Sequence, residues 1–160
     1  MIRPATLADL PRIVGIYNTS IPGRLATADT EPVTVEARRP WFENHSPRRP
    51  IWVAEQDVVL GWASLTDFYG RPAYGATAEL SIYVAPETQR RGVARALVAH
   101  AIAQAPALGL KTLLGFVFGH NAPSLRLLGG FGFVRWGHLP KVAVLDGAER
   151  DLDIVGLKVG

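Results

Sequence analysis

The chain has 160 residues, of which 48% are hydrophobic, and this length and composition predict one folded domain over residues 1–160 and exclude a disordered chain. It contains no cysteine, which excludes disulfides, thiolate metal sites and a cysteine nucleophile. A formal net charge of +3 from largely scattered basic residues, without a signal-like N-terminus or a membrane-length apolar run, favours a cytoplasmic protein that binds neither nucleic acid nor membrane.

Turn residues and hydrophobic periodicity divide the first half of the chain into short elements. A capping box formed by Thr6 and Asp9 precedes a helix whose apolar residues recur at helical spacing as far as Tyr17. A second helix is expected to be capped by Thr34 and kinked at Pro40. The pattern predicts a strand at 2–5, helices at 10–17 and 34–44, a loop at 21–32, and a hairpin with strands at 51–55 and 58–66.

In the second half, predicted strands alternate with helices. Gly61, within the second hairpin strand, indicates a bulge or a close approach of another segment. An alanine-rich helix expected at 93–108 and closed by Gly109 is apolar nearly all round, so it should be heavily buried or covered by a partner. The other predicted elements are a loop at 67–75, strands at 76–84 and 112–118, a helix at 121–128, and final strands at 133–138 and 152–158. This order predicts an α/β fold, with a mixed sheet and helices on both faces.

Residues 80–97 have the pattern of a strand, a short turn and the start of a helix. The run from Gln89 to Ala94 presents successive backbone N–H groups, with small residues where a ligand would come close, and the helix directs the positive end of its dipole to the same place. Arg90 and Arg91 add positive charge. The pattern predicts a diphosphate site, and the alternative is an ordinary strand–helix connection with a solvated arginine pair. A dinucleotide-binding fingerprint and a P-loop are both absent from the sequence.

This stretch resembles motif A of the GCN5-related N-acetyltransferases (GNAT), in which Gln/Arg-x-x-Gly-x-Gly/Ala binds the pyrophosphate of acetyl-CoA; here the pattern is Gln89, Gly92 and Ala94. Further segments are similar to the phosphinothricin and methionine-sulfoximine acetyltransferase branch: 2–6, 8–10, 16–18, 27–32, 41–42, 71–74 and 121–124. The resemblance implies the GNAT acyl-CoA N-acyltransferase fold, a mixed and mostly antiparallel central sheet flanked by helices. It also implies direct acetyl transfer from acetyl-CoA to the α-amine of a small amino acid analogue.

Glu79, on the central strand, is the candidate catalytic base. The resemblance implies that it binds a water that relays the proton of the amine, and a carboxylate in a largely apolar strand should have a raised pKa. The alternative is a carboxylate paired with a nearby arginine. The resemblance also implies that the pantetheine arm pairs with free peptide groups of the same strand. The implied acetyl-CoA-binding residues are Ile82, Tyr83, Val84, Gln89, Arg90, Arg91, Gly92, Val93, Ala94, Arg95, Asn121 and Ser124.

Two of these residues have simpler alternatives. The side chain of Tyr83 could be part of the core, and Asn121 could be a helix N-cap. For the acceptor, Arg71 and Tyr74 are the candidates, because an amino acid carries a carboxylate and arginine binds carboxylates through a bidentate fork. The candidate acceptor-binding residues are Arg71, Tyr74, Phe68, Tyr69 and Thr27. The resembling branch completes this pocket at a homodimer interface, so a homodimer is expected; the alternative is a surface loop with no ligand.

The sequence also departs from the family. Many members carry a tyrosine as general acid on the last helix, where this chain has Leu128, so that role is vacant. Four histidines without metal-like spacing make a zinc site unexpected, and no serine-hydrolase motif is present. Two rival functions stay open: an acetyltransferase that acts on a polypeptide N-terminus or lysine, and a non-catalytic CoA-binding module. Nucleic-acid binding is the weakest rival.

Overall fold

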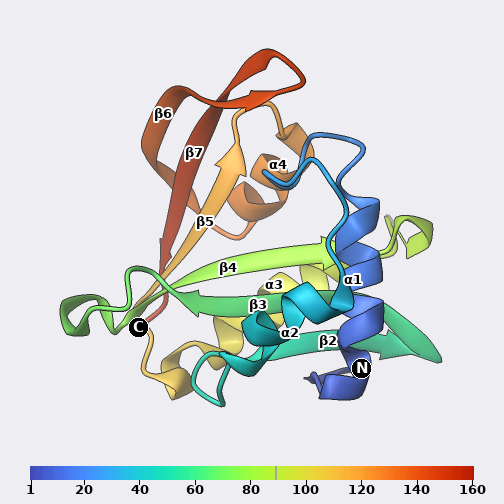
Figure 1. Ribbon diagram of the computed structural model, residues 1–160. Coiled ribbons are helices and arrows are strands. Elements are labelled where there is room, and N and C mark those ends of the chain that lie inside the picture. The colour runs from blue at the N-terminus through green and yellow to red at the C-terminus, as the bar shows by residue number, and fades with distance from the viewer. Residues whose placement is uncertain (89) are drawn as a thin grey trace.

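The computed structural model describes every residue except Gln89, and its strands form one seven-stranded sheet (Figure 1). The strands are β1 (Ile2–Pro4), β2 (Ile51–Gln56), β3 (Val58–Asp67), β4 (Thr77–Val84), β5 (Thr112–Phe118), β6 (Val134–Leu145) and β7 (Ala148–Lys158). The helices are α1 (Leu10–Thr19), α2 (Val35–Glu43), α3 (Val93–Gln104) and α4 (Ala122–Gly130). The sheet order is β1-β2-β3-β4-β5-β7-β6, with β4–β5 parallel and the other pairs antiparallel. The predicted mixed, mostly antiparallel sheet is confirmed.

The predicted caps of the first two helices are confirmed. Thr6 and Asp9 form the capping box, with the Thr6 N–H donating to Asp9 Oδ2 at 2.7 Å, and one 3-10 turn separates it from α1. Thr34 Oγ1 accepts from the Ala37 N–H at 3.1 Å and caps α2, which contains Pro40. The Thr34 side chain satisfies a donor that the start of α2 leaves free, whereas the capping box closes the 3-10 turn before α1 and not α1 itself, whose N-cap is Asp9.

Two hydrophobic clusters lie on opposite faces of the sheet. Behind it in Figure 1, α3 and α4 pack on a core that includes Leu65, Leu97 and Leu113. In front, α1 and α2 cover only the half of the sheet formed by β2, β3 and β4, where Ile13 and Trp62 are buried. None of the helices that the structure describes lies over the front face of β5, β7 and β6 (Figure 1).

The prediction for the alanine-rich helix is partly wrong. The α-helix ends at Gln104 rather than at 108, because Pro106 cannot continue it and begins a 3-10 turn; Gly109 then closes the segment at φ 77°. The described chain also does not bury this helix all round. Leu97 and Val98 are buried, whereas the exposed side carries Ala96, Ala99 and Ala103. Alanine is short enough to be common on both faces of a helix, and the alternative, that a partner covers this exposed side, stays a prediction.

The last two strands are longer than predicted and form a hairpin. Its two turn residues, Asp146 and Gly147, have φ values of 52° and 81°, the left-handed pair that an Asp-Gly hairpin turn requires. The sequence contained this signal. The alternation of side chains that would extend the predicted strands to this turn is interrupted, because the pairing of β6 shifts twice. The shifts lie between Arg135 and Gly137 and between Leu139 and Ala143, and the second stretch contains Pro140.

The parallel strands β4 and β5 separate soon after they meet. Their pairing is limited to Thr77 with Thr112, Ala78 with Leu113, and Glu79 with Leu114. Beyond this point β4 continues to Val84 along β3, while β5 continues to Phe118 along β7. Figure 1 shows the two strands diverging; we call the opening between them the fork.

Gly61 makes the close approach that its position predicted. A Cβ atom there would lie 2.9 Å from Val84 Cγ1, 3.0 Å from the Tyr83 carbonyl oxygen and 3.1 Å from Val93 Cγ1. The residue pairs with Ala54 at a register shift of the β2–β3 hairpin. Gly61 therefore lets β3 lie close to both the end of β4 and the start of α3.

The variant Gly61→Ala is expected to lose about 1–3 kcal/mol of unfolding free energy in urea, because a methyl group must displace backbone and two valines. Gly15→Ala is the control, since Gly15 lies in α1 with nothing within 4 Å of its added Cβ. Gly15→Ala should raise the free energy of unfolding by about 0.5–1 kcal/mol, because alanine favours the helix more than glycine does. If wild type and Gly61→Ala unfold at the same urea concentration, the close approach of β3 to β4 and α3 at Gly61 is contradicted.

Candidate functional site

Glu79 lies where the fork opens, since it is the last residue of β4 that pairs with β5. Side chains alternate along a strand, so Glu79, Ser81 and Tyr83 face the front, while Leu80 and Ile82 face α3. Burial raises the pKa of the Glu79 carboxyl group, and a hydrogen bond from Ser81 limits the rise. Among the described residues no arginine or lysine pairs with Glu79. The structure therefore favours the unpaired carboxylate over the paired alternative.

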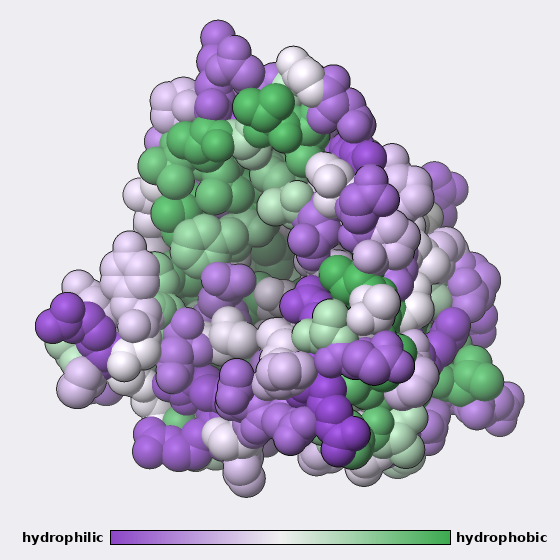
Figure 2. Space-filling view, in the orientation of Figure 1, coloured by the Kyte–Doolittle hydropathy of each residue, from purple (hydrophilic) through white to green (hydrophobic). Residues whose placement is uncertain are grey.

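Main-chain groups of β4 line one side of the fork. From Leu80 to Val84 the strand pairs with β3 on its other edge, and no described strand pairs with its edge toward β5. Figure 2 shows a hollow in this region of the molecule. An extended chain could add to this edge in the manner of a short strand, with Ile82 and Val84 offering peptide groups.

The start of α3 has the form of an anion site. Arg90 and Gly92 adopt left-handed φ values of 67° and 79°, and α3 begins at Val93 without a side-chain cap. Such a turn, followed by free first-turn N–H groups, forms a concave nest of donors. A Cβ at Gly92 would meet no atom of the described residues within 4 Å, and Arg90 and Arg91 are exposed. These features fit a diphosphate, as the sequence predicted.

The other residues assigned to this region are placed as follows. Ala94 lies half-buried in the first turn of α3, and Arg95 is exposed with its guanidinium 5.3 Å from the centroid of the Phe131 ring. Ser124 is half-buried in α4. Gln89 lies outside the described residues.

Asn121 follows β5 and is the N-cap of α4, as its alternative interpretation proposed. Its Oδ1 accepts from the Ser124 N–H at 3.2 Å, and its Nδ2 donates to the Leu25 carbonyl oxygen at 3.2 Å. Asn121 therefore joins α4 to the loop between α1 and α2, a contact that no local sequence pattern indicates.

The front wall of the fork is built from α1, the following loop and β4. The Tyr17 hydroxyl donates to Asp29 and hydrogen-bonds Thr27, and the Tyr17 ring packs edge-on against Tyr83 with centroids 5.0 Å apart. The Arg38 guanidinium lies 4.6 Å from the centroid of the Tyr17 ring. Burial raises the pKa of both tyrosines, so both stay neutral donors. The sequence placed Tyr17 in the first helix and in the resembling segment 16–18 without a role, and no pattern in it singled out Arg38.

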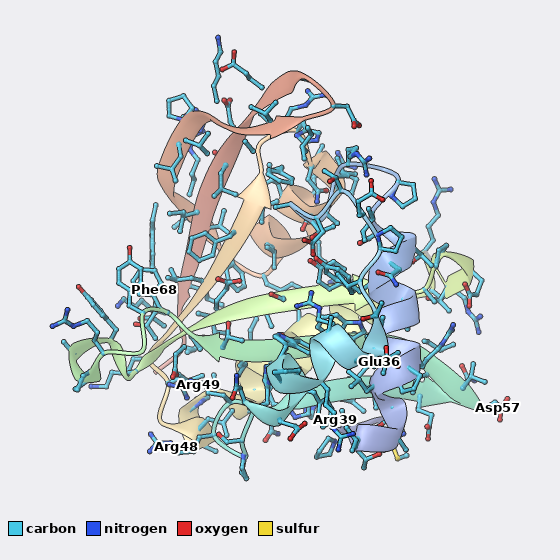
Figure 3. The ribbon with its side chains drawn as sticks, viewed as in Figure 1. Glu36, Arg39, Arg48, Arg49, Asp57 and Phe68 are labelled. Carbon is cyan, nitrogen blue, oxygen red and sulfur yellow. The ribbon has the colours of Figure 1, made fainter. Side chains whose placement is uncertain are left out.

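Arg71, Tyr69 and Tyr74 are exposed on the loop between β3 and β4. Phe68, labelled at the margin of the molecule in Figure 3, stacks on Tyr69 at 4.5 Å and contacts Tyr74 and Phe116. This loop precedes β4 and projects from the left of Figure 1, at the end where β4 and β5 pair, whereas α1 lies on the right, where the two strands are apart. One chain therefore does not bring Arg71 together with the wall formed by Tyr17 and Thr27.

An apolar surface lies between this loop and the fork, on the uncovered front face of β5, β7 and β6. Phe116 pairs with Ile154, and Trp136 lies over Gly156. Trp136 is 48% and Leu139 41% exposed, and Figure 2 shows hydrophobic residues gathered over this part of the sheet. We call this surface the open face and define it by Phe116, Trp136, Leu139, Leu152 and Ile154.

Two negative findings complete the description. In residues 1–88 and 90–160, no three His, Asp or Glu side chains are grouped so that they could hold a metal ion. Within the same residues, no helix has both the length and the hydropathy needed to span a bilayer.

Comparison with known proteins agrees with the geometry. The model of the acetyltransferase (GNAT) family matches residues 13–133. Protein YwnH of Bacillus subtilis (strain 168), named provisionally as a phosphinothricin acetyltransferase, is 47% identical over 157 residues, covering 97% of this chain and 96% of its own length. An L-methionine sulfoximine/L-methionine sulfone acetyltransferase of Pseudomonas aeruginosa is 32% identical over 161 residues, covering 99% of this chain and 94% of that protein.

A solved structure shows the same fold. The phosphinothricin acetyltransferase of Sinorhizobium meliloti, crystallised in complex with acetyl-CoA, superposes with a TM-score of 0.94 at 27% identity and covers 100% of this chain and 88% of that one. The resemblance found in the sequence is confirmed. The chain is an N-acetyltransferase that belongs to the GNAT family.

Proposed function

We propose that this acetyltransferase transfers an acetyl group directly from acetyl-CoA to the α-amine of a small amino acid analogue of the phosphinothricin, methionine sulfoximine or methionine sulfone type. The observation that carries the proposal is the unpaired Glu79 carboxylate at the opening of the fork, beside the unpartnered edge of β4. The names of the relatives supply the acceptor class.

The residues around the fork fit acetyl-CoA. The amide nest at Arg90–Ala94 would hold the diphosphate, and the edge of β4 at Ile82–Val84 would pair with the pantetheine amides. When bound, acetyl-CoA supplies the acetyl group as a thioester. A peptide N–H near Tyr83 or Val84 would donate to the carbonyl oxygen as negative charge develops on it.

Glu79 would act as the general base. An amine is a nucleophile only without its extra proton, and a raised pKa makes the Glu79 carboxylate a stronger base for that proton. Leu128 is buried and has no proton to give, so this position of α4 supplies no general acid. A thiol of pKa about 8.5, by analogy with cysteine, can leave as the thiolate without one.

We infer that the acceptor pocket is completed by a second copy of the chain. The candidate carboxylate ligand, Arg71, lies away from the wall formed by Tyr17 and Thr27, so one chain holds the two parts of the pocket separately. The open face lies between these parts and contacts Phe68 of the Arg71 loop through Phe116. An exposed apolar surface continuous with half of a site is suited to an identical partner that carries the other half.

An acceptor panel tests the activity. In the presence of acetyl-CoA, the reaction of phosphinothricin, methionine sulfoximine or methionine sulfone is expected to release free thiol at least about tenfold faster than that of peptides with a free N-terminus or an internal lysine. The amines of such peptides have no carboxylate next to them, whereas the proposed pocket binds one. Faster reaction with peptides would favour the polypeptide acetyltransferase. Tight binding of CoA in calorimetry, with no thiol release from any acceptor, would instead indicate a binding module.

A further inference from the structure

The loop between α1 and α2 crosses the open end of the fork. In Figure 1 it rises from the end of α1, passes α4 and returns to α2. We call its residues 24–29 the strap. Three successive strap carbonyls accept hydrogen bonds from both sides of the fork: Arg24 from His120 Nε2 at 2.9 Å, Leu25 from Asn121 Nδ2 at 3.2 Å, and Ala26 from the Tyr83 hydroxyl at 3.2 Å. His120 and Asn121 follow β5, whereas Tyr83 is on β4, so the strap links the two diverging strands.

Both ends of the strap are fixed further. Arg24 has φ 53°, an unfavourable conformation for a residue with a side chain, and its guanidinium bonds Asp146 at 2.8 Å and the Ile21 carbonyl oxygen at 2.9 Å. At the other end, the Tyr17 hydroxyl holds Thr27 and Asp29. The strap therefore places two polar side chains on the wall that Tyr83 shares with Glu79.

His120 makes a single polar contact with the described chain. Because Nε2 donates to a carbonyl, the proton must be on Nε2, which leaves Nδ1 as a bare acceptor. Nδ1 is buried without a hydrogen-bond partner among the described residues, and the ring stacks on Phe118 with centroids 5.5 Å apart. A buried nitrogen without a hydrogen-bond partner lowers the stability of the fold. An apolar side chain of similar shape would avoid this cost, so what histidine contributes at this position is the Nε2–H donor.

We propose that His120 is a positioning residue for the acceptor. By holding the Arg24 carbonyl, it fixes the strap across the fork so that Thr27 and Asp29 face the acceptor amine on the Glu79 side of β4. The role in turnover rests on the proposed function; the conformation of the strap does not.

Three variants test this role. His120→Leu removes the donor and keeps an apolar side chain, whereas His120→Gln keeps an N–H donor at a comparable reach. His45→Leu is the matched control: His45 also bonds one carbonyl, that of Trp41 at 2.8 Å, and also buries an unpartnered nitrogen, but it lies after α2 and does not contact the strap. The two readouts are steady-state kinetics with the best acceptor of the panel and tryptic cleavage after Arg24, followed by mass spectrometry of the 1–24 fragment.

In His120→Leu, the acceptor KM and the rate of cleavage after Arg24 are each expected to rise about tenfold, the effect of one lost hydrogen bond, while the acetyl-CoA KM changes less than twofold. His120→Gln should stay within about threefold of wild type, and His45→Leu should change neither readout. If His120→Leu is cleaved after Arg24 at the wild-type rate, the proposal is overturned. It is also overturned if His120→Gln is as impaired as His120→Leu, because the loss would then come from the packing of the ring and not from the hydrogen bond. If wild type acetylates no amine, the proposed function fails, and cleavage alone still decides whether His120 fixes the strap.

Discussion

Glu79→Gln is expected to lower kcat/KM about 10²- to 10³-fold near neutral pH while the dissociation constant of acetyl-CoA stays within twofold. The amide has the shape of the carboxylate but cannot accept a proton. Acetyl-CoA affinity should be spared, because the residues proposed to bind it are main-chain groups of Ile82–Val84 and of the turn before α3. Stopped-flow thiol release and calorimetry measure the two quantities separately. Unchanged turnover would remove Glu79 from the chemistry.

The pH dependence gives an independent check on the same residue. Burial raises the pKa of Glu79 above its ordinary value of 4.5, and only the ionised form is a base. Wild-type kcat/KM should therefore rise tenfold per pH unit until the raised pKa is passed, in addition to the ionisation of the acceptor amine itself. In Glu79→Gln the rise in kcat/KM that comes from the ionisation of Glu79 should be absent. If kcat/KM depends on pH in the same way in both proteins, the rise comes from the ionisation of the acceptor amine alone.

The same pKa shift predicts that the inactive variant is the more stable protein at neutral pH. Below 4.5 the carboxyl group is neutral in both folded and unfolded chains, so its burial is tolerated. As the pH rises through the raised folded-state pKa, the folded chain must hold a poorly solvated charge, and stability is lost. Glutamine carries no such charge. The melting temperature of Glu79→Gln should thus exceed that of wild type at pH 7.5, and the difference should disappear as the pH falls below 4.5.

The sequence predicted those parts of the molecule that local interactions determine. Thr34 caps α2 through a residue three positions away, and Gly92 lies in a turn that needs a left-handed φ. The resemblance proposes the turn before α3 as the cofactor site because motif A is one contiguous stretch, and it proposes Glu79, directly before that stretch, as the base. In each case the decisive contacts lie within a few residues, so a linear pattern can report them.

The resemblance included the segment 27–32 and proposed Thr27 as an acceptor-binding residue, but the contacts that build the front wall and hold the strap could not be predicted from local patterns. His120 and Arg24 are 96 positions apart, and neither occupies a recognisable motif. Tyr17 satisfies helical spacing as a core residue, and nothing in that spacing shows that its hydroxyl bonds Asp29. The failure for β6 is different, because the signal existed: Asp146-Gly147 is a strong hairpin turn, but Pro140 and two register shifts interrupt the alternation that would have extended the strands to it.

Arg71→Ala and Glu79→Gln, each of low activity alone, are expected to form an active mixed dimer if the acceptor site is shared between two copies of the chain. Arg71→Ala should raise the acceptor KM about 100-fold through loss of a bidentate carboxylate contact, and Glu79→Gln lacks the base. In a symmetric dimer that takes Glu79 from one copy and Arg71 from the other, a mixed pair has one site with both wild-type residues and one with neither. Co-expression with two different tags, followed by purification through both, isolates such pairs, which should show about half of the wild-type activity per dimer.

The controls follow from the same symmetry. Glu79→Gln paired with the double variant Glu79→Gln/Arg71→Ala contains no complete site in any arrangement and should stay inactive. Trp136→Glu in both partners should prevent recovery by placing charge on the open face, where Trp136 is 48% exposed and covers Gly156. If the purified mixed pair gains nothing, Arg71 acts within its own chain or not at all. A shared site would explain why the open face and the aromatic loop are exposed in a single copy, since both would then be parts of one pocket.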